Sequence, residues 1–136
     1  MIDRYTLPEM GNIWTEQAKF QSWLDVELAA CEANLSLGKI PESGMKEIRE
    51  KATFCPNRIL EIESEVRHDV IAFLTNLNEN IGDAGRFIHI GMTSSDVLDT
   101  GLALQLKASV RLLIKENKIL EGIIREKARE QIQSDD

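Results

Sequence analysis

Two short stretches hold both histidines of this chain, and charged or hydroxyl-bearing residues surround each of them. His68 lies in R-H-D-V at residues 67–70, and His89 begins H-I-G-M-T-S-S-D at residues 89–96. Histidine has the unperturbed pKa closest to neutrality, so it can exchange protons near neutral pH. Arginine and hydroxyl groups beside it favour an anionic ligand. We therefore predict that the two stretches furnish a site for an anionic substrate.

The stretch around His68 precedes an apolar run with helical spacing. Arg67 can bind a phosphate or carboxylate through its planar guanidinium, and His68 can carry a proton or donate a hydrogen bond. Asp69 is typical of a helix cap. The same three residues are also typical of a surface charge cluster at the start of a helix. Their types and spacing alone leave both interpretations open.

A second helix start is expected after Gly91, where Thr93 and Asp96 have the spacing of a capping box with aspartate in place of glutamate. Free backbone N–H groups at a helix N-terminus, with the hydroxyls of Thr93 and Ser94 beside them, suit a carboxylate or phosphate. A cap and an anion site are compatible here. His89 lies between two isoleucines, which is more typical of a buried histidine with satisfied hydrogen bonds than of a catalyst.

Composition narrows the class of protein. The 136 residues, 43% of them hydrophobic, suffice for one domain with a continuous core. A formal net charge of −7 argues against a nucleic-acid partner, and no apolar run reaches the roughly 20 residues of a membrane span. The histidines and cysteines lack the spacing of metal ligands, so no metal site is expected. Cys31 and Cys55 are predicted to be free thiols of a reduced, cytoplasmic protein.

Apolar residues recur at helical spacing along most of the chain, whereas alternation with period two is short. Thr15 is a typical N-cap and Gly38 a typical helix end. Pro41 and Pro56 are typical of the first turn of a helix. These signals predict helices over residues 15–37, 41–52, 56–62 and 69–81, followed by a long helix over 95–132. The fold class is therefore predicted to be all-α.

The last of these helices is too long for the preceding residues to cover. At about 1.5 Å per residue it would extend roughly 55 Å, and its apolar stripe is broad without sustained heptad spacing, which disfavours a plain coiled coil. We predict partner helices, from another chain or from sequence outside these 136 residues. A boundary is expected near residues 90–95, between a helical lobe and this helix. Trp14 and Trp23 are expected in the core of the lobe.

Several stretches together resemble the adenylosuccinate lyase family of the fumarase/aspartase superfamily. They follow one another along nearly the whole chain: R-Y-T-L-P-E-M at residues 4–10; Phe20, Trp23, Leu24 and Glu27; R-I-L-E-I-E at 58–63; R-H-D-V-I-A-F at 67–73; and H-I-G-M-T-S-S-D-V-L-D-T at 89–100. The last motif is shared in looser form across the superfamily. The first motif and the R-H-D-V stretch indicate adenylosuccinate lyase more narrowly.

The resemblance implies a lyase of purine biosynthesis that needs no metal or organic cofactor. Such an enzyme eliminates fumarate from adenylosuccinate, giving AMP, and from the succinylated aminoimidazole carboxamide ribotide. A base removes a proton next to a carboxylate, the carbanion is held as an aci-carboxylate, and an acid protonates the leaving nitrogen. The resemblance also implies a cytoplasmic homotetramer. Residues 1–93 would form the N-terminal helical lobe, and residues 94–136 would begin the first long helix of a central bundle.

At the phosphate end of the substrate, the resemblance implies three binding residues. Arg4 and Tyr5 would contact the nucleotide there, and His89 would lie near the same phosphate. For Arg4 and Tyr5, the residues by themselves suggest nothing more than an ordinary exposed chain end.

At the succinyl end, the resemblance implies five more residues. Arg67, His68 and Asp69 would line the pocket, with His68 assisting the acid–base chemistry. Thr93 and Ser94 would hold a carboxylate of the succinyl group. The two histidine-containing stretches would then form one pocket wall.

The principal acid and base of the family are expected outside this chain. A member carries the acid histidine in T-H-x-x-x-x-P and the base in a mobile S-S-x-M-P-x-K-x-N-P loop, and these 136 residues contain neither. The chain alone is therefore expected to be inactive, and to self-associate or be poorly stable. Two alternatives remain: a non-enzymatic helical interaction module that docks through the long helix, and another lyase of the superfamily, such as argininosuccinate lyase or fumarase.

Overall fold

The computed structural model describes residues 2–134, and every regular element within that range is helical. The elements are η1 (Asp3–Tyr5), α1 (Pro8–Ile13), α2 (Glu16–Ser36), α3 (Glu42–Lys51), α4 (Pro56–Val66), α5 (Asp69–Ile81), η2 (Gly82–Phe87) and α6 (Ser94–Ser134). The predicted all-α fold class is confirmed. The two 3₁₀ segments and the short α1 were not predicted from the sequence.

The helix ends follow the local signals. The Thr15 hydroxyl accepts a hydrogen bond from the Ala18 N–H at 3.1 Å, which caps α2. Gly38 and Gly82 have φ of +70° and +79°, backbone angles that glycine adopts without steric cost. Pro41 precedes α3, and Pro56 is the first residue of α4. The helices therefore begin and end at the residues whose types predict helix ends.

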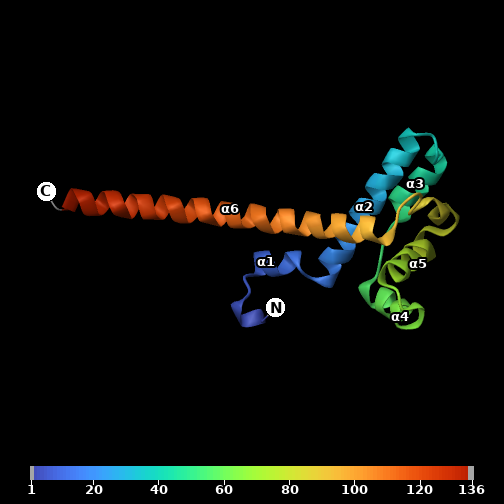
Figure 1. Cartoon of the computed structure of the whole chain (residues 1–136), viewed down its shortest axis with the longest axis horizontal. Coiled ribbons are helices and arrows are strands. Elements are labelled where there is room, and N and C mark those ends of the chain that lie inside the picture. Colours follow the sequence, from blue (N-terminus) through green and yellow to red (C-terminus); the bar gives the residue numbers. More distant parts are fainter. Residues whose placement is uncertain (1, 135–136) are drawn as a thin grey trace.

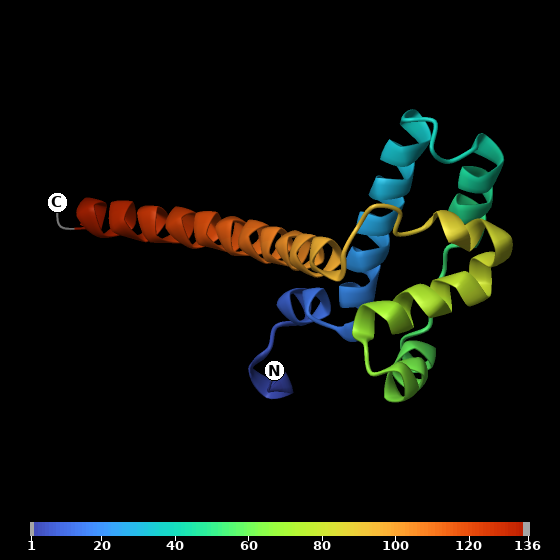
Figure 2. The ribbon, with the colours of Figure 1, turned by 45° about the vertical axis from the view of Figure 1, so that its right-hand side comes forward.

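Aromatic rings join the helices of the lobe. Phe20 and Trp23 of α2 meet Phe73 of α5 with ring centroids 5.9 Å and 5.5 Å away, and all three side chains are buried. Figure 2 shows α2, α3, α4 and α5 gathered on one side of the molecule, with η2 closing the lobe. This core fixes the two helix starts that the sequence analysis singled out.

Trp14 corrects one expectation. It is 39% exposed rather than part of the core, and its indole N–H donates to the Ser109 hydroxyl of α6 at 3.1 Å. The reason is that the helix is interrupted between them: Trp14 is the C-cap residue of α1, whereas Trp23 lies within α2. The spacing between the two tryptophans therefore does not place their side chains on one helix face. Trp23, as expected, is buried.

The first turns of α6 pack on α2. Val97 is fully buried, and Gly101 lies so close to α2 that an added Cβ would come 2.7 Å from Trp23 Cδ1. The Gln105 amide donates to the Ile13 carbonyl at 2.7 Å. These contacts fix the direction of α6 relative to the lobe.

Beyond that contact, α6 projects away from the lobe as a single helix (Figure 1). Its large apolar side chains are exposed there: Val110, Leu113, Ile114, Ile119, Leu120, Ile123, Ile124 and Ile132. The prediction that the preceding residues cannot cover this helix is confirmed. Among the described residues, no helix has the length and apolarity needed to cross a membrane.

Candidate functional site

A tight corner between α4 and α5 carries the first histidine. Arg67 ends α4 with left-handed backbone angles, φ 57° and ψ 32°, and its N–H donates to the Glu63 carbonyl. His68 then extends at φ −150° and ψ 117° and caps α5. The corner brings Arg67, His68 and Asp69 together at a helix N-terminus. Arg67 is exposed, and His68 and Asp69 are partly exposed.

His68 caps α5 through its ring. Its Nδ1 accepts a hydrogen bond from the Ile71 N–H at 3.4 Å, so in the neutral ring the proton is on Nε2. This corrects the expectation that Asp69 is the cap, because the left-handed turn at Arg67 starts the helix one residue earlier. Asp69 is instead the first residue of α5, where its carboxylate accepts from the Val70 N–H at 2.7 Å. A negative charge is favourable at this end of a helix.

His89 is held in a different way. Its backbone is left-handed, with φ 65°, and its ring Nδ1 and its backbone N–H both face Glu27 of α2. The ring Nδ1 lies 2.6 Å from Glu27 Oε1, and the backbone N–H donates to Oε2 at 3.0 Å. The sequence-based expectation of a histidine with satisfied hydrogen bonds is therefore correct for Nδ1.

Glu27 is the site residue that residue-level sequence reasoning missed. Its side chain is fully buried, on the face of α2 that also carries the buried Leu24 and Cys31. Burial raises the pKa of the Glu27 carboxyl, and the hydrogen bonds and charge of His89 oppose that rise. A signal did exist: a carboxylate on an otherwise apolar helix face requires a buried partner.

The start of α6 has one half of the predicted capping box. The Asp96 carboxylate accepts from the Thr93 N–H at 2.8 Å, and the Asp96 N–H donates to the Thr93 carbonyl at 3.0 Å. Thr93 therefore precedes the first helical residue, Ser94, at the positive end of a 41-residue helix. His89 lies in the short segment just before it. Because the Thr93 N–H is bound by Asp96, an anion here can be held by the Ser94 N–H and by the hydroxyls of Thr93 and Ser94.

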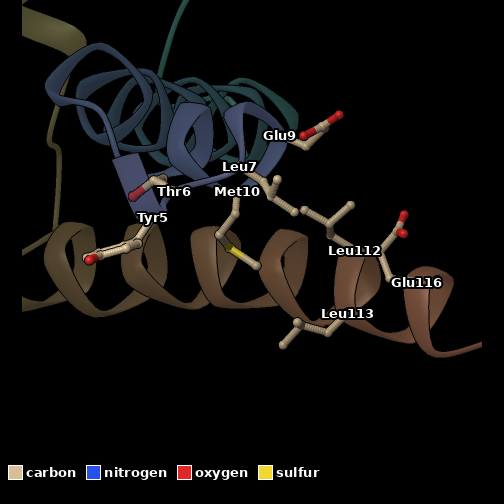
Figure 3. A pocket seen from close by; sticks show the side chains of 8 residues that line it. All are labelled: Tyr5, Thr6, Leu7, Glu9, Met10, Leu112, Leu113 and Glu116. Carbon is tan, nitrogen blue, oxygen red and sulfur yellow. The ribbon is translucent and has the colours of Figure 1, made fainter. Parts of the chain in front are cut away.

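Arg4 and Tyr5 lie elsewhere. Tyr5 and Met10, together with Leu112 and Leu113 of α6, line a cavity of about 400 Å³. Figure 3 shows Met10 between Tyr5 and the two leucines. Leu112 lies 18 residues after Ser94, which is roughly 27 Å along a helix at about 1.5 Å per residue. Tyr5 is 74% exposed, and the Arg4 guanidinium stacks on its ring at 4.8 Å. Tyr5 therefore shares a cavity with the middle of α6, and neither Thr93 nor Ser94 lines that cavity.

Neither cysteine has a metal-binding environment in the part of the chain that the structure describes, where no group of three or more potential metal ligands occurs. Cys31 is buried and Cys55 exposed, and both are free thiols. The Cys31 Sγ donates to the Phe87 carbonyl at 3.7 Å, just before His89.

Comparison with known proteins identifies the class. A family model described as "Lyase" matches residues 3–133, so the chain belongs to this lyase family. A fumarate lyase structure from Mesorhizobium sp. BNC1 superposes with a TM-score of 0.70 and 28% identity, covering 76% of this chain and 25% of that one.

The curated relatives are more specific. Adenylosuccinate lyase of Synechocystis sp. is 64% identical over 124 residues, covering 90% of this chain and 29% of that protein. Adenylosuccinate lyase of Bacillus subtilis is 48% identical over 130 residues, covering 96% of this chain and 30% of that protein. The resemblance found from the motifs is confirmed. The chain spans about three-tenths of the length of these relatives.

Proposed function

We propose that this chain supplies the N-terminal portion of an adenylosuccinate lyase. The complete enzyme would eliminate fumarate from adenylosuccinate and from the succinylated aminoimidazole carboxamide ribotide. The observation that carries this proposal is the 64% identity to a curated adenylosuccinate lyase over 90% of the chain. A lyase of this kind acts on a soluble, phosphorylated small molecule and needs neither metal nor organic cofactor, and we expect it in the cytoplasm.

The start of α6 is assigned to a carboxylate of the succinyl group. The hydroxyls of Thr93 and Ser94 and the Ser94 N–H would hold it, at the positive end of the helix. Loss of the proton beside that carboxylate places negative charge on its oxygens, so donors fixed in advance stabilise the transition state more than the substrate. This part of the chain would therefore contribute to rate as well as to binding.

The corner between α4 and α5 is assigned to the same pocket. Arg67 would pair with an anionic group of the substrate, and Asp69 would orient polar groups beside it. His68 presents Nε2–H as a donor when its ring is neutral. That proton can support the leaving nitrogen without His68 being the principal acid. His89 is assigned to the phosphate end of the substrate.

Arg4 and Tyr5 are assigned to the pocket of another copy. Tyr5 shares its cavity with Leu112, which lies roughly 27 Å along α6 from Ser94, and this placement favours a second copy as the source of these two residues. A homotetramer in which several subunits build each site would provide that second copy. Residues 1–93 would then form the lobe, and residues 94–136 would pack into a central bundle through the exposed apolar side chains of α6.

Fumarate release tests the proposal. The 136-residue chain alone should release none from adenylosuccinate, because the principal acid and base of the family are absent. A hybrid in which this chain replaces the matched 124-residue stretch of the Synechocystis enzyme should release fumarate at a rate within about tenfold of the parent. A well-folded but inactive hybrid would contradict the proposal, as would clear turnover by the chain alone.

The exposed face of α6 favours a second candidate, a helical interaction module without enzymatic activity. Sedimentation of the isolated chain addresses that face: we expect self-association or poor stability, and a stable monomer would contradict the expectation. The hybrid separates the two functions, because an interaction module gives no fumarate in any assembly.

A further inference from the structure

The buried Glu27 has no role in the reaction as assigned so far. It comes from α2, far in sequence from the loop before α6, and its side chain is fully buried. Removing a carboxylate from water is costly unless donors compensate it. His89 places two groups against this carboxylate: its backbone N–H, which donates to Oε2, and its ring Nδ1, which lies 2.6 Å from Oε1. This pairing joins the core of the lobe to the segment that leads into Thr93 and Ser94.

The arrangement determines where the ring proton is. Oε2 of Glu27 accepts the His89 N–H at 3.0 Å, and Oε1 faces Nδ1 at 2.6 Å. A carboxylate that accepts at both oxygens requires the proton on Nδ1. Nε2 then has a free lone pair when the ring is neutral. Nε2 has no partner among the described residues, and the side chain is 21% exposed, so Nε2 is the nitrogen available to a ligand.

The backbone gives an independent reason to regard His89 as selected for its ring. A residue with a Cβ pays a conformational penalty at φ 65° that glycine avoids. Such a penalty persists where surrounding contacts enforce it, and it is frequent at functional sites. The double contact with Glu27 enforces it here.

We propose that Glu27 is a positioning residue for His89 in the lyase reaction: it keeps a proton on Nδ1, so that Nε2, once protonated, faces the anionic substrate as a cationic donor. The inference rests on the proposed function, because it assumes a substrate beside this loop. Glu27 acts through His89 and does not itself touch the substrate. When Nε2 takes up a proton, Glu27 balances the charge of the ring, which then presents a cationic donor to a phosphate or carboxylate.

Glu27→Gln tests the proton placement. Its single amide oxygen can accept the His89 N–H, and its NH₂ group then faces Nδ1 as a donor. The ring should therefore invert to the Nε2–H form, which nitrogen chemical shifts of a ¹⁵N-histidine-labelled chain distinguish directly. The matched control is Glu32→Gln. It removes an exposed ion pair between Glu32, also in α2, and Arg49, and it should leave the His89 ring in the same protonated form. An unchanged ring in Glu27→Gln would overturn the proposal.

Kinetics of the hybrid enzyme test the positioning role. Glu27→Gln leaves a neutral Nε2–H donor in place of the cationic ring, and a neutral donor binds an anion more weakly. It should therefore raise the KM for adenylosuccinate about tenfold with kcat changed less than about threefold, which is the pattern of lost binding. Glu32→Gln should change neither. His89→Asn keeps a residue that tolerates the left-handed backbone but removes the ring, and it should raise KM similarly. Combining it with Glu27→Gln should add nothing further.

The outcomes separate the two claims. If the unsubstituted hybrid gives no fumarate, the proposed function fails, and the ring form in the chain still decides the Glu27–His89 assignment. If the hybrid is active but Glu27→Gln and Glu32→Gln behave alike, or the double variant shows additive losses, the positioning role is overturned. If Glu27→Gln loses helicity by circular dichroism, His89→Asn provides the deciding measurement, and an unchanged KM overturns the role.

Discussion

The corner between α4 and α5 and the loop before α6 each hold a histidine through Nδ1, in opposite senses. At the corner, His68 accepts from the backbone N–H of Ile71. In the loop, His89 Nδ1 lies 2.6 Å from the buried carboxylate of Glu27, and in the proposed Nδ1–H form it donates to that carboxylate. The His68 side chain is 42% exposed and the His89 side chain 21%. When both rings are neutral, Nε2 is therefore a hydrogen-bond donor in His68 and an acceptor in His89.

The difference teaches that the neighbour, rather than the histidine, sets the chemistry. A backbone N–H next to the ring makes a cap, which any short acceptor side chain could replace. A buried carboxylate makes a pair whose removal strands two donors inside the protein. We therefore expect substitutions in the loop to lower the free energy of unfolding more than substitutions at the corner.

The largest effect is expected at Glu27. Glu27→Ala should lower the free energy of unfolding by about 2–4 kcal/mol, because it leaves both donors of His89 without a partner in a buried space. Urea unfolding followed by circular dichroism measures the loss. Glu32→Ala, on the same helix but exposed, should cost much less. Equal losses at the two positions would remove the distinction between a buried and a surface pair.

The second largest loss of stability is expected where α6 packs on α2, because this contact fixes the position of the loop before α6. Gly101→Ala should destabilise the chain by about 1–3 kcal/mol, since the new Cβ would overlap Trp23. Gly122→Ala is the control on the same helix: nothing lies within 4 Å of its added Cβ. It should stabilise the helix by up to about 1 kcal/mol. Thermal unfolding of both variants gives the comparison, and a neutral Gly101→Ala would show that the helices can separate freely.

At the corner the expected cost is smaller. His68→Ala removes the cap of α5 and should cost about 0.5–1 kcal/mol of unfolding free energy. His68→Asn keeps a side chain that caps well and should be nearly neutral in stability. In the hybrid enzyme both variants should lose activity, because neither retains the ring. A large loss of stability in His68→Asn would mean that the corner depends on the ring for packing as well.

The smallest effect on stability is expected from the thiols: Cys31 reports on the segment before α6, and the exposed Cys55, at the start of α4, is its control. Burial, followed by the charges of Glu27 and Glu32, raises the pKa of Cys31 from 9.0 to about 11. Because the folded-state pKa is above the unfolded one, the contribution of this thiol to stability is complete below pH 9.0 and is lost as pH rises through about 11. At about pH 8, a thiol reagent should modify the exposed Cys55 quickly and Cys31 only after unfolding. Fast modification of Cys31 would mean that the segment at Phe87 opens readily.

Much of the fold could be predicted because its signals are local. A capping threonine, glycines with left-handed backbone and prolines at helix starts act within one turn of the chain. Trp14 was misplaced for a matching reason: a short helix ends there, and periodicity carries no information across a break. The cap of α5 was misplaced by one residue, because the left-handed turn at Arg67 has no strong sequence signature.

The sequence by itself determined the family, the helical class and the motifs that carry the candidate site. It also determined that α6 is too apolar and too long to be covered by the lobe, since the spacing and length of an apolar stripe are properties of a single segment. Only the tertiary structure decided that Glu27 pairs with His89 and that Tyr5 shares a cavity with Leu112 and Leu113 of α6. Those facts depend on contacts between residues distant in the chain, and helix packing rather than local propensity sets such contacts.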